Sequence, residues 1–482
     1  MKTKYITTAI PYTNAQPHIG HAMDYLLADV WFRYQKNQGH EVLFSAGLDE
    51  HGTKIAEKAK AENQTPQEFV DQLTPIFQDF LRQMNISHTQ FVRTTDAEHM
   101  LRVQEVWRRL DAAGMIYKAK YEGWYCVGCE GFVTETEAKA MNYRCPNHAK
   151  LEKVEDENYF LKVSQFTEEI RRFSEQIVPE WRGKEIRELI KNGAQDVSIS
   201  RSVEKLSWGV PVPGDETQVM YVWVDALSNY ITVLDQGAKL EDWWKNLETR
   251  KVWPAEIEVL GKDILRFHAV IWPAILLGLG LELPEKLLVH GFVNLSGDKL
   301  SKSKGNAISP LDIIDEYGCD AFRYFFLRYV PTFDDGDYTP ERFKNSYNSD
   351  LANTLGNLVS RSSNMITRFA GGKIAKSKDF VWDSTRFSQQ MDELRFDLAL
   401  EEIWKLVQHL NQYIDEQKPW ELNKDSSKQA EVAAVMNYLA TGLRQVGELL
   451  TPFLPDTAEK IKDIFGGASV GELSKVLFER KQ

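Results

Sequence analysis

Long apolar runs are absent from this 482-residue chain. The most apolar stretch, AVIWPAILLGLGL, contains a proline and is too short to cross a bilayer. The amino-terminal MKTKYITTAIPY lacks a secretory core, because Pro11 interrupts its apolar residues. We therefore expect a cytoplasmic protein that does not act at a membrane.

Cysteine and positive charge are also scarce. The chain has only four cysteines, too few for a disulfide framework in a protein of this length. Its 58 basic residues are outnumbered by 70 acidic ones, which gives a net charge of −12. This excludes a general polycation, although a local basic stripe is enough to bind phosphates. The 43% apolar content is typical of a soluble globular protein with about three domains.

The first hundred residues read as strand, helix and strand. KYITTAI is a β-branched run, helical spacing extends from Met23 to Tyr34, and GHEVLFSAGLDEHG contains a second strand. This βαβ order predicts an α/β domain with a doubly wound parallel sheet. The stretch from Lys54 to Leu110 is expected to be mostly helical.

The pattern changes twice farther along the chain. Short strands, turns and clustered cysteines after Met115 indicate an insertion between two halves of one α/β domain. After about Ser346, apolar residues at helical spacing predict a helix bundle. We expect a first α/β half at 1–115 and the insertion at 116–215. A second α/β half with a connecting segment follows at 216–345, and a helical domain at 346–482.

Two histidines flank a glycine at the expected start of the first helix. In PHIGHAMDYLL, His18 and His21 project from the same side of the first helical turn. A helix N-terminus attracts phosphate, and Gly20 lets a ligand approach the backbone. The histidines are therefore candidates to donate hydrogen bonds to phosphate oxygens. The alternative is a pair of partly buried histidines that only cap the helix.

A second candidate segment carries three lysines. VHGFVNLSGDKLSKSKGNAISP follows an expected strand and places Lys299, Lys302 and Lys304 in a loop rich in serine and glycine. Flexible ammonium groups in such a loop suit a polyphosphate. By itself, a lysine-rich loop is more typical of a solvated surface.

Together, the two segments resemble the signatures of class I aminoacyl-tRNA synthetases. PHIGH matches the HIGH signature, and KLSKS matches KMSKS with Leu300 in place of methionine. The resemblance implies a Rossmann-like catalytic domain in which an amino-acid carboxylate attacks the α-phosphate of ATP and the acyl group then passes to tRNA. It also implies Mg²⁺ bound with ATP and catalytic roles for His18, His21, Lys299 and Lys302.

The intervening sequence resembles methionyl-tRNA synthetases, in AIPYTNAQPHIGH, MYVWVDALSNY, GKDILRFHAVIWPA and HGFVNLSGDKLSKSKGN. The resemblance implies that methionine is joined to tRNA(Met), including the initiator, through a methionyl-adenylate. It implies methionine contacts from Ala9, Ile10, Tyr12, Asp49, Trp223, Ala226, Tyr230, Ile264, Phe267, His268 and Trp272, with Asp49 at the substrate ammonium. It implies ATP contacts from Tyr12, Asn14, His18, Gly20, His21, Gly261, Lys262, Asp263, Lys299, Ser301 and Lys302.

The expected methionine contacts are rich in aromatic rings. A thioether is polarizable and makes favourable contacts with such rings. The alternative is that these aromatic residues belong to the ordinary core. Leu227 stands where some family members have proline, which would alter one wall of the pocket.

Four potential metal ligands occupy the insertion. The spacing C-x2-C-x15-C-x2-H, formed by Cys126, Cys129, Cys145 and His148, is typical of tetrahedral zinc. Four protein ligands leave no open position, so the sequence predicts a structural Zn²⁺. Reduced thiols without metal are the alternative. The resemblance supports a single zinc knuckle.

The helical region carries the anticodon residues that the resemblance implies. LGNLVSRSSN and EQKPWELNK match anticodon-reading segments and contribute Asn357, Arg361 and Trp420. Asn357 and Arg361 share a helix face, and Trp420 suits stacking on a splayed base. The alternatives are a solvated charge and a packed tryptophan. No dimerisation module follows in this sequence, so we expect a monomer.

Three other functions fit part of this pattern. A cysteine or leucine synthetase would share both signatures, but the zinc spacing and the short insertion argue against both. A small adenylyltransferase also uses an HxGH loop, although such enzymes are shorter and lack the helical domain. A zinc-ribbon RNA-binding factor without catalysis would not need the intact histidines and lysines.

Overall fold

The computed structural model describes residues 3–126, 131–133, 135–145, 150–249, 251–295, 298–299, 309–374, 380–471 and 475–482. Its internal contacts divide the chain into two compact units, each built from three segments. The sheet unit comprises Met1–Gln16, Leu43–Gln78 and His88–Val289, and the bundle unit comprises Pro17–Val42, Asp79–Ser87 and His290–Gln482. None of the described helices combines the length and apolar character that a bilayer crossing needs.

A six-stranded sheet forms the centre of the sheet unit, in the order β3-β2-β1-β11-β12-β7. The pairs β2–β3, β1–β11 and β12–β7 are all parallel. All five residues of β11 are buried, as expected for a central strand covered on both faces. The strands are β1 (Lys4–Thr8), β2 (Val42–Leu48), β3 (Gln90–Arg93), β7 (Ile177–Val178), β11 (Ile257–Gly261) and β12 (Leu287–His290).

The prediction that Lys54–Leu110 is mostly helical is confirmed, although it did not include one short strand. Helices α2 (Thr53–Ala61), α3 (Pro66–Gln83) and α4 (Ala97–Ala112) are separated by the edge strand β3. This strand is only four residues long and has one buried side chain, so it shows no clear alternation. It forms because its backbone pairs with β2, from Ser45↔Gln90 to Leu48↔Arg93.

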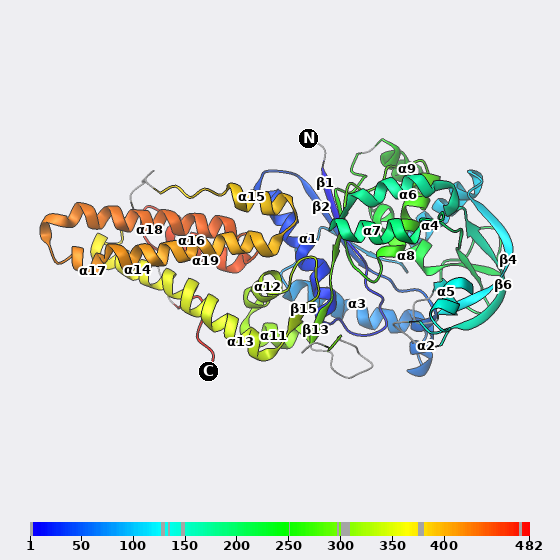
Figure 1. The fold of residues 1–482 in the computed structure, drawn as a ribbon, viewed down its shortest axis with the longest axis horizontal. Coiled ribbons are helices and arrows are strands. Elements are labelled where there is room, and N and C mark those ends of the chain that lie inside the picture. The colour runs from blue at the N-terminus through cyan, green and yellow to red at the C-terminus, as the bar shows by residue number, and fades with distance from the viewer. Residues whose placement is uncertain are drawn as a thin grey trace. The chain divides into compact units, whose positions relative to one another are not determined.

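Several helices of the sheet unit contribute to one large apolar cluster. Figure 1 shows α4, α6, α7, α8 and α9 gathered in this unit. Helix α8 contacts α4, α10 and the π-helical segment η3. Trp243, Trp253 and Trp272 are among the largest side chains that this core buries completely. The remaining elements are α6 (Thr167–Phe173), α7 (Glu180–Leu189), α8 (Val222–Thr232), α9 (Leu240–Glu248), η3 (Phe267–Ile271) and α10 (Trp272–Gly278).

A second sheet follows the first α/β half, where the sequence predicts an insertion. Its strand order is β5-β4-β6-β8. The long antiparallel pair β4–β6 runs in register from Ile116↔Leu161 to Tyr125↔Glu152 (Figure 1). Its elements are β4 (Ile116–Cys126), β5 (Gly131–Val133), α5 (Glu135–Ala140), β6 (Glu152–Leu161) and β8 (Val197–Ser198), followed by the pair β9 (Ser200–Ser202) and β10 (Gln218–Met220).

The bundle unit contains the first-signature helix α1 (Ile19–Asn37) and the helices after residue 309. Helix α12 contacts α1, α11, α16 and α19. A small sheet in the order β14-β13-β15 joins the segment before α11 to the segment after α12. The elements are β13 (Val293–Leu295), β14 (Asp298–Lys299), β15 (Gly336–Tyr338), α11 (Pro310–Tyr317), α12 (Cys319–Arg328), α13 (Pro340–Ser346), η5 (Tyr347–Gly356), α14 (Asn357–Ala370), α15 (Thr385–Asp392), α16 (Phe396–Gln417), α17 (Pro419–Leu422), α18 (Gln429–Leu450) and α19 (Pro455–Phe465).

The helical periodicity read from the sequence corresponds to buried faces of the bundle. Leu406 and Leu410 on α16 are completely buried, as are Leu439 and Leu443 on α18. The two helices contact each other and α14. Arg323 is also buried there, and its guanidinium donates to the carbonyl oxygens of Phe453 and Pro452 and pairs with Asp29.

Candidate active site

The two histidines cap helix α1 through reciprocal hydrogen bonds. His18 is the N-cap residue, and its Nδ1 accepts from the backbone N–H of Gly20 at 3.1 Å. The Nδ1 of His21 accepts from the backbone N–H of His18 at 3.3 Å. The two rings stack with centroids 3.9 Å apart. The capping interpretation is thus realised in the structure, and it also fixes how each ring presents its other nitrogen.

Because each Nδ1 accepts a backbone hydrogen bond, the proton of each neutral ring lies on Nε2. His18 and His21 are therefore two parallel donors at the N-terminus of one helix. Gly20 is required for this arrangement, since a Cβ there would come within 2.8 Å of Cε1 of His18. The glycine thus makes room for the His18 ring, in addition to the ligand access inferred from the sequence.

A hydrogen bond links α1 to the segment that leads into the lysine loop. Nε2 of His290 lies 3.1 Å from Oδ1 of Asp24, one turn after His21. The chain then forms β13 and β14, with Asn294 paired to Lys299 through the backbone. The first signature and the beginning of the second therefore belong to the same unit. Ser301 and Lys302 lie outside the described residues.

The loop after β2 is held in place at every residue. Asp49 donates its N–H to the carbonyl of Pro11 and accepts at its own carbonyl from Thr13. The carboxylate of Glu50 is completely buried, and its two oxygens share the N–H that Nε of Arg93 donates. Nε1 of Trp208 donates to the carbonyl of Glu50 at 2.6 Å. Asp49 itself is 7% exposed, so the predicted ammonium ligand lies on a mostly buried, hydrogen-bonded loop.

Sequence reasoning missed a buried acid that ties this loop to helix α8. Oδ2 of Asp225 lies 2.7 Å from Nδ1 of His51, and its Oδ1 lies 2.8 Å from Nε2 of His99. All three side chains are buried. Burial alone would raise the pKa of Asp225, but the attraction of His51 and hydrogen bonds from His51 and His99 outweigh it and lower the pKa to about 2. The only feature of the sequence that could have pointed to Asp225 is its place as an acidic residue within the apolar run YVWVDALSNYI.

Aromatic rings from α8 and η3 form a continuous wall. Trp223 and Phe267 stack with centroids 3.7 Å apart, and Trp223 meets the ring of His268 edge to face. The hydroxyl of Tyr230 lies 2.6 Å from Nε2 of His268. The ring of Tyr230 also meets Trp272 edge to face at 5.7 Å. Five side chains from α8, η3 and the start of α10 are therefore brought into one row.

The protonation state of His268 follows from its neighbours. Its Nδ1 donates to the carbonyl of Ile264 at 3.0 Å, so Nε2 accepts from the hydroxyl of Tyr230. Burial lowers the pKa of His268 to about 4, although the hydrogen bond to Ile264 opposes this. His268 is therefore neutral at pH 7 and orients the Tyr230 hydroxyl.

The other predicted contacts of the sheet unit lie at strand ends or on the same helices. Ala9 follows β1 and donates its N–H to the carbonyl of Val259, while Ala226 is buried on α8. Tyr12 forms an isolated parallel bridge with Asp49 and packs on the apolar cluster of α2 and α3. The remaining positions are Ile10 and Asn14 after β1, Gly261 at the end of β11, and Lys262, Asp263 and Ile264 directly after it.

Two of the four predicted metal ligands lie in the described part of the insertion. Cys126 ends β4 and Cys145 follows α5, and both belong to one small buried cluster with Ala138 and Leu151. Two thiols from separate elements thus belong to the same small cluster, which fits a thiolate-rich metal site. Cys129 and His148 lie outside the described residues.

The predicted anticodon residues lie on α14 and α17. Asn357 begins α14 and is exposed. Arg361, one turn later, pairs with Asp415 near the end of α16 at 3.0 Å. Trp420 follows shortly after Asp415 and is 38% exposed, so it is not packed in the core. The ion pair therefore places Arg361 beside the end of α16, which α17 with Trp420 follows directly in the chain.

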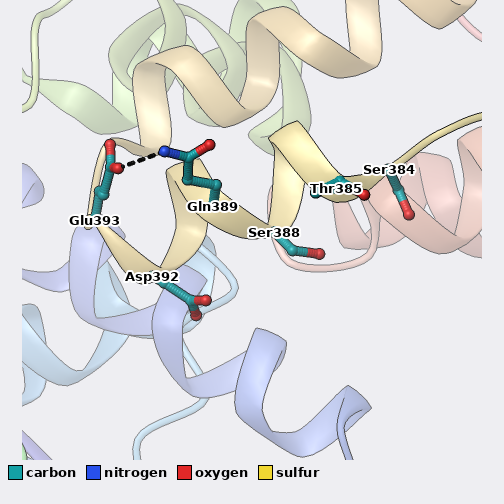
Figure 2. Close-up of a pocket in the computed structure, with 6 residues that line it drawn as sticks. All are labelled: Ser384, Thr385, Ser388, Gln389, Asp392 and Glu393. Carbon is teal, nitrogen blue, oxygen red and sulfur yellow. Dashed lines mark hydrogen bonds between the residues drawn. The ribbon is translucent and has the colours of Figure 1, made fainter.

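A pocket on α15 is separate from all of these positions. Figure 2 shows two acidic groups on its wall and a hydrogen bond from Nε2 of Gln389 to Glu393. It has no aromatic or cationic lining residue, so it suits neither a thioether nor a phosphate. Its lining residues are Ser384, Thr385, Ser388, Gln389, Asp392 and Glu393.

Comparisons with known proteins identify the family. A model described as tRNA synthetases class I (M) matches residues 4–156 and 148–363. A model described as the anticodon-binding domain of tRNA ligase matches residues 384–479. The chain is 42% identical to a methionine–tRNA ligase of Caldanaerobacter subterraneus subsp. tengcongensis, over 96% of this chain and 74% of that protein. The chain belongs to the methionyl-tRNA synthetase family.

Other members of the family agree with this assignment. The methionine–tRNA ligase of Clostridium acetobutylicum is 41% identical, over 96% of this chain and 73% of that protein. The structure of Mycobacterium tuberculosis methionyl-tRNA synthetase in complex with methionyl-adenylate is similar with a TM-score of 0.90 and 34% identity, and it covers 100% of both chains. The predicted function, a class I methionine–tRNA ligase, is confirmed, as is the α/β sheet domain followed by a helical domain.

Proposed function

We propose that this methionyl-tRNA synthetase activates methionine with ATP and transfers it to tRNA(Met), including the initiator, through the residues described above. The observation that carries the proposal is the Asp225 link. It joins the loop of Asp49 to helix α8, which bears Trp223, Ala226 and Tyr230. The loop of Asp49 is thus hydrogen-bonded to the helix that carries Trp223 and Tyr230, and a carboxylate there suits an ammonium group attached to an apolar, polarizable side chain.

Each group has one task in this mechanism. Asp49 binds the methionine ammonium, and the aromatic wall with Ala9, Ile10 and Ile264 encloses the thioether. The Nε2–H donors of His18 and His21 stabilise charge on the phosphates as the methionine carboxylate attacks the α-phosphate and pyrophosphate leaves. Lys299 and Lys302 bind the departing pyrophosphate. The remaining ATP contacts come from Tyr12, Asn14, Gly20, Gly261, Lys262, Asp263 and Ser301.

Two metals accompany this proposal. Mg²⁺ bound with ATP would neutralise phosphate charge. Cys126, Cys129, Cys145 and His148 would hold a structural Zn²⁺, which would crosslink the insertion. We also propose a cytoplasmic monomer with domain boundaries at 1–115, 116–215, 216–345 and 346–482.

Pyrophosphate exchange with each amino acid, followed by tRNA charging, tests the whole proposal. Methionine-dependent exchange and charging of tRNA(Met) are the expected result. Exchange driven by leucine or cysteine would assign the chain to another substrate. Exchange without any amino acid would indicate an adenylyltransferase, and no exchange at all would leave an RNA-binding protein.

Trp420→Ala should separate the two half-reactions. We expect unchanged pyrophosphate exchange and a loss of about 10-fold or more in kcat/KM for tRNA charging, because stacking on one base contributes about 1–3 kcal/mol. Trp181→Ala, which alters an exposed tryptophan on α7, is the matched control and should leave charging intact. Equal loss of both half-reactions in the Trp420 variant would contradict an anticodon role.

Cys126→Ser should release the proposed zinc. We expect about one zinc per chain in the wild-type protein and much less in the variant, measured by atomic emission on dialysed samples. Cys319→Ser is the matched control, because Cys319 begins α12 in the other unit and should not affect metal content. Equal zinc in wild type and the Cys126 variant would exclude this thiol as a ligand.

A further inference from the structure

A carboxylic acid lies in the middle of the fully buried strand β11. Glu258 is 0% exposed, and its Oε1 accepts a hydrogen bond of 2.9 Å from Nε1 of Trp272. Its Oε2 has no hydrogen-bond partner among the described residues. Most buried strand positions carry apolar side chains, so an acid here needs a specific reason.

The surroundings of Glu258 favour its neutral form. An ionised carboxylate whose only partner is an indole N–H is strongly disfavoured in an apolar interior. Burial accordingly raises the pKa of Glu258 to about 8, although the hydrogen bond from Trp272 opposes this shift. Glu258 is therefore mostly protonated at pH 7, and its carbonyl oxygen holds the indole.

The indole that Glu258 holds is the last ring of the aromatic wall. Trp272 packs edge to face on Tyr230, whose hydroxyl bonds to His268, and His268 in turn meets Trp223. On its other side Trp272 packs on Trp253. A buried indole N–H needs an acceptor, so loss of the Glu258 carbonyl would rotate the ring or admit water, and Tyr230 would move with it.

We propose that Glu258 is a positioning residue that fixes the orientation of Trp272 and thereby sets the affinity of the aromatic wall for methionine. This inference rests on the proposed function, because it takes the wall as the methionine site. Glu258 acts through Trp272 and not on the reacting atoms. Its removal should therefore change binding of methionine and leave ATP binding and the chemical step nearly intact.

Three variants test the role of the hydrogen bond. Glu258→Gln keeps a carbonyl acceptor, whereas Glu258→Leu removes it and Trp272→Phe removes the donor. We expect the Leu and Phe variants to raise KM for methionine in pyrophosphate exchange about 3- to 10-fold, as for loss of one neutral buried hydrogen bond. Both should leave kcat and KM for ATP within about 2-fold, and the Gln variant should behave as wild type.

A double variant and a matched control separate positioning from general destabilisation. If Glu258 acts only through the indole N–H, Glu258→Leu should add no further change in KM to Trp272→Phe. Trp253→Phe perturbs the same core, but its Nε1 donates to the carbonyl of Glu282 instead. This control should lower the melting temperature without changing KM for methionine.

The pH dependence of KM gives an independent readout. Above about pH 8 Glu258 ionises, and a buried charge next to Trp272 disfavours the closed packing of the wall, so KM for methionine should rise more steeply in wild type than in Glu258→Gln. Among the titratable groups nearby, Tyr5 of β1 has a pKa raised by burial and His268 of η3 has a pKa of about 4, so neither changes charge in this range. The methionine ammonium titrates equally with both enzymes. The ratio of KM in wild type to KM in Glu258→Gln at each pH therefore removes its effect.

The outcomes distinguish this inference from the proposed function. If wild-type exchange does not depend on methionine, the proposed function fails and the inference fails with it. If wild-type exchange depends on methionine but Glu258→Leu and Trp272→Phe leave its KM unchanged, only the inference is wrong. An equal rise in KM for the Gln and Leu variants at pH 7 would also overturn it.

Discussion

His21→Ala should lower methionine-dependent pyrophosphate exchange by about 100-fold or more. Loss of one preorganised donor to a developing negative charge typically has an effect of this size. In this structure the donor is Nε2–H, because Nδ1 of His21 is occupied by the backbone N–H of His18. The measurement is kcat/KM for ATP at saturating methionine.

The helix-capping role of His21 must be separated from its role as a donor. His21→Asn places an amide oxygen near the position of Nδ1 and can keep the cap, but it has no donor at the position of Nε2. We expect this variant to melt like wild type and to lose as much exchange as His21→Ala. His40→Ala, beyond the other end of α1, is the matched control. If the His21→Asn variant exchanges pyrophosphate as fast as the wild type, His21 is excluded as a hydrogen-bond donor to the phosphates.

Asp225→Ala should destabilise the sheet unit by about 3–5 kcal/mol, as expected when one partner of a buried ionic cluster is removed. The loss leaves the rings of His51 and His99 buried without their carboxylate partner. The measurement is urea unfolding followed by tryptophan fluorescence. Asp242→Ala, on the exposed side of α9 in the same unit, should change the free energy of unfolding by less than about 0.5 kcal/mol.

The pH dependence of the free energy of unfolding tests whether Asp225 is ionised in the folded protein. Its pKa is lowered to about 2 in the folded protein from an ordinary value of 3.8. Its contribution is therefore complete above about pH 4 and is lost as the pH falls through 2. Asp225→Asn should lack this contribution, so the stability difference between wild type and variant should shrink in acid. A difference that stays constant from pH 6 to pH 2 would contradict the assignment.

Local patterns in the sequence were sufficient where each element depends on its own residues. The β-branched run at Lys4–Thr8 and the leucine spacing of α16 and α18 predicted their elements, because burial of one face follows from periodicity. The strand β3 was missed because its four residues become a strand only through pairing with β2. The capped histidine pair was recognisable because both partners lie within one turn.

The sequence by itself determined the family, the α/β and helical organisation, and the residue types of the candidate site, because each is written in short contiguous motifs. Only the tertiary structure decided which side chains hold those motifs in place. Asp225 joins His51 and His99 across separations of 174 and 126 residues, and Glu258 on β11 holds Trp272 at the start of α10. Buried polar groups must find partners wherever the fold brings them, and no local pattern encodes that choice.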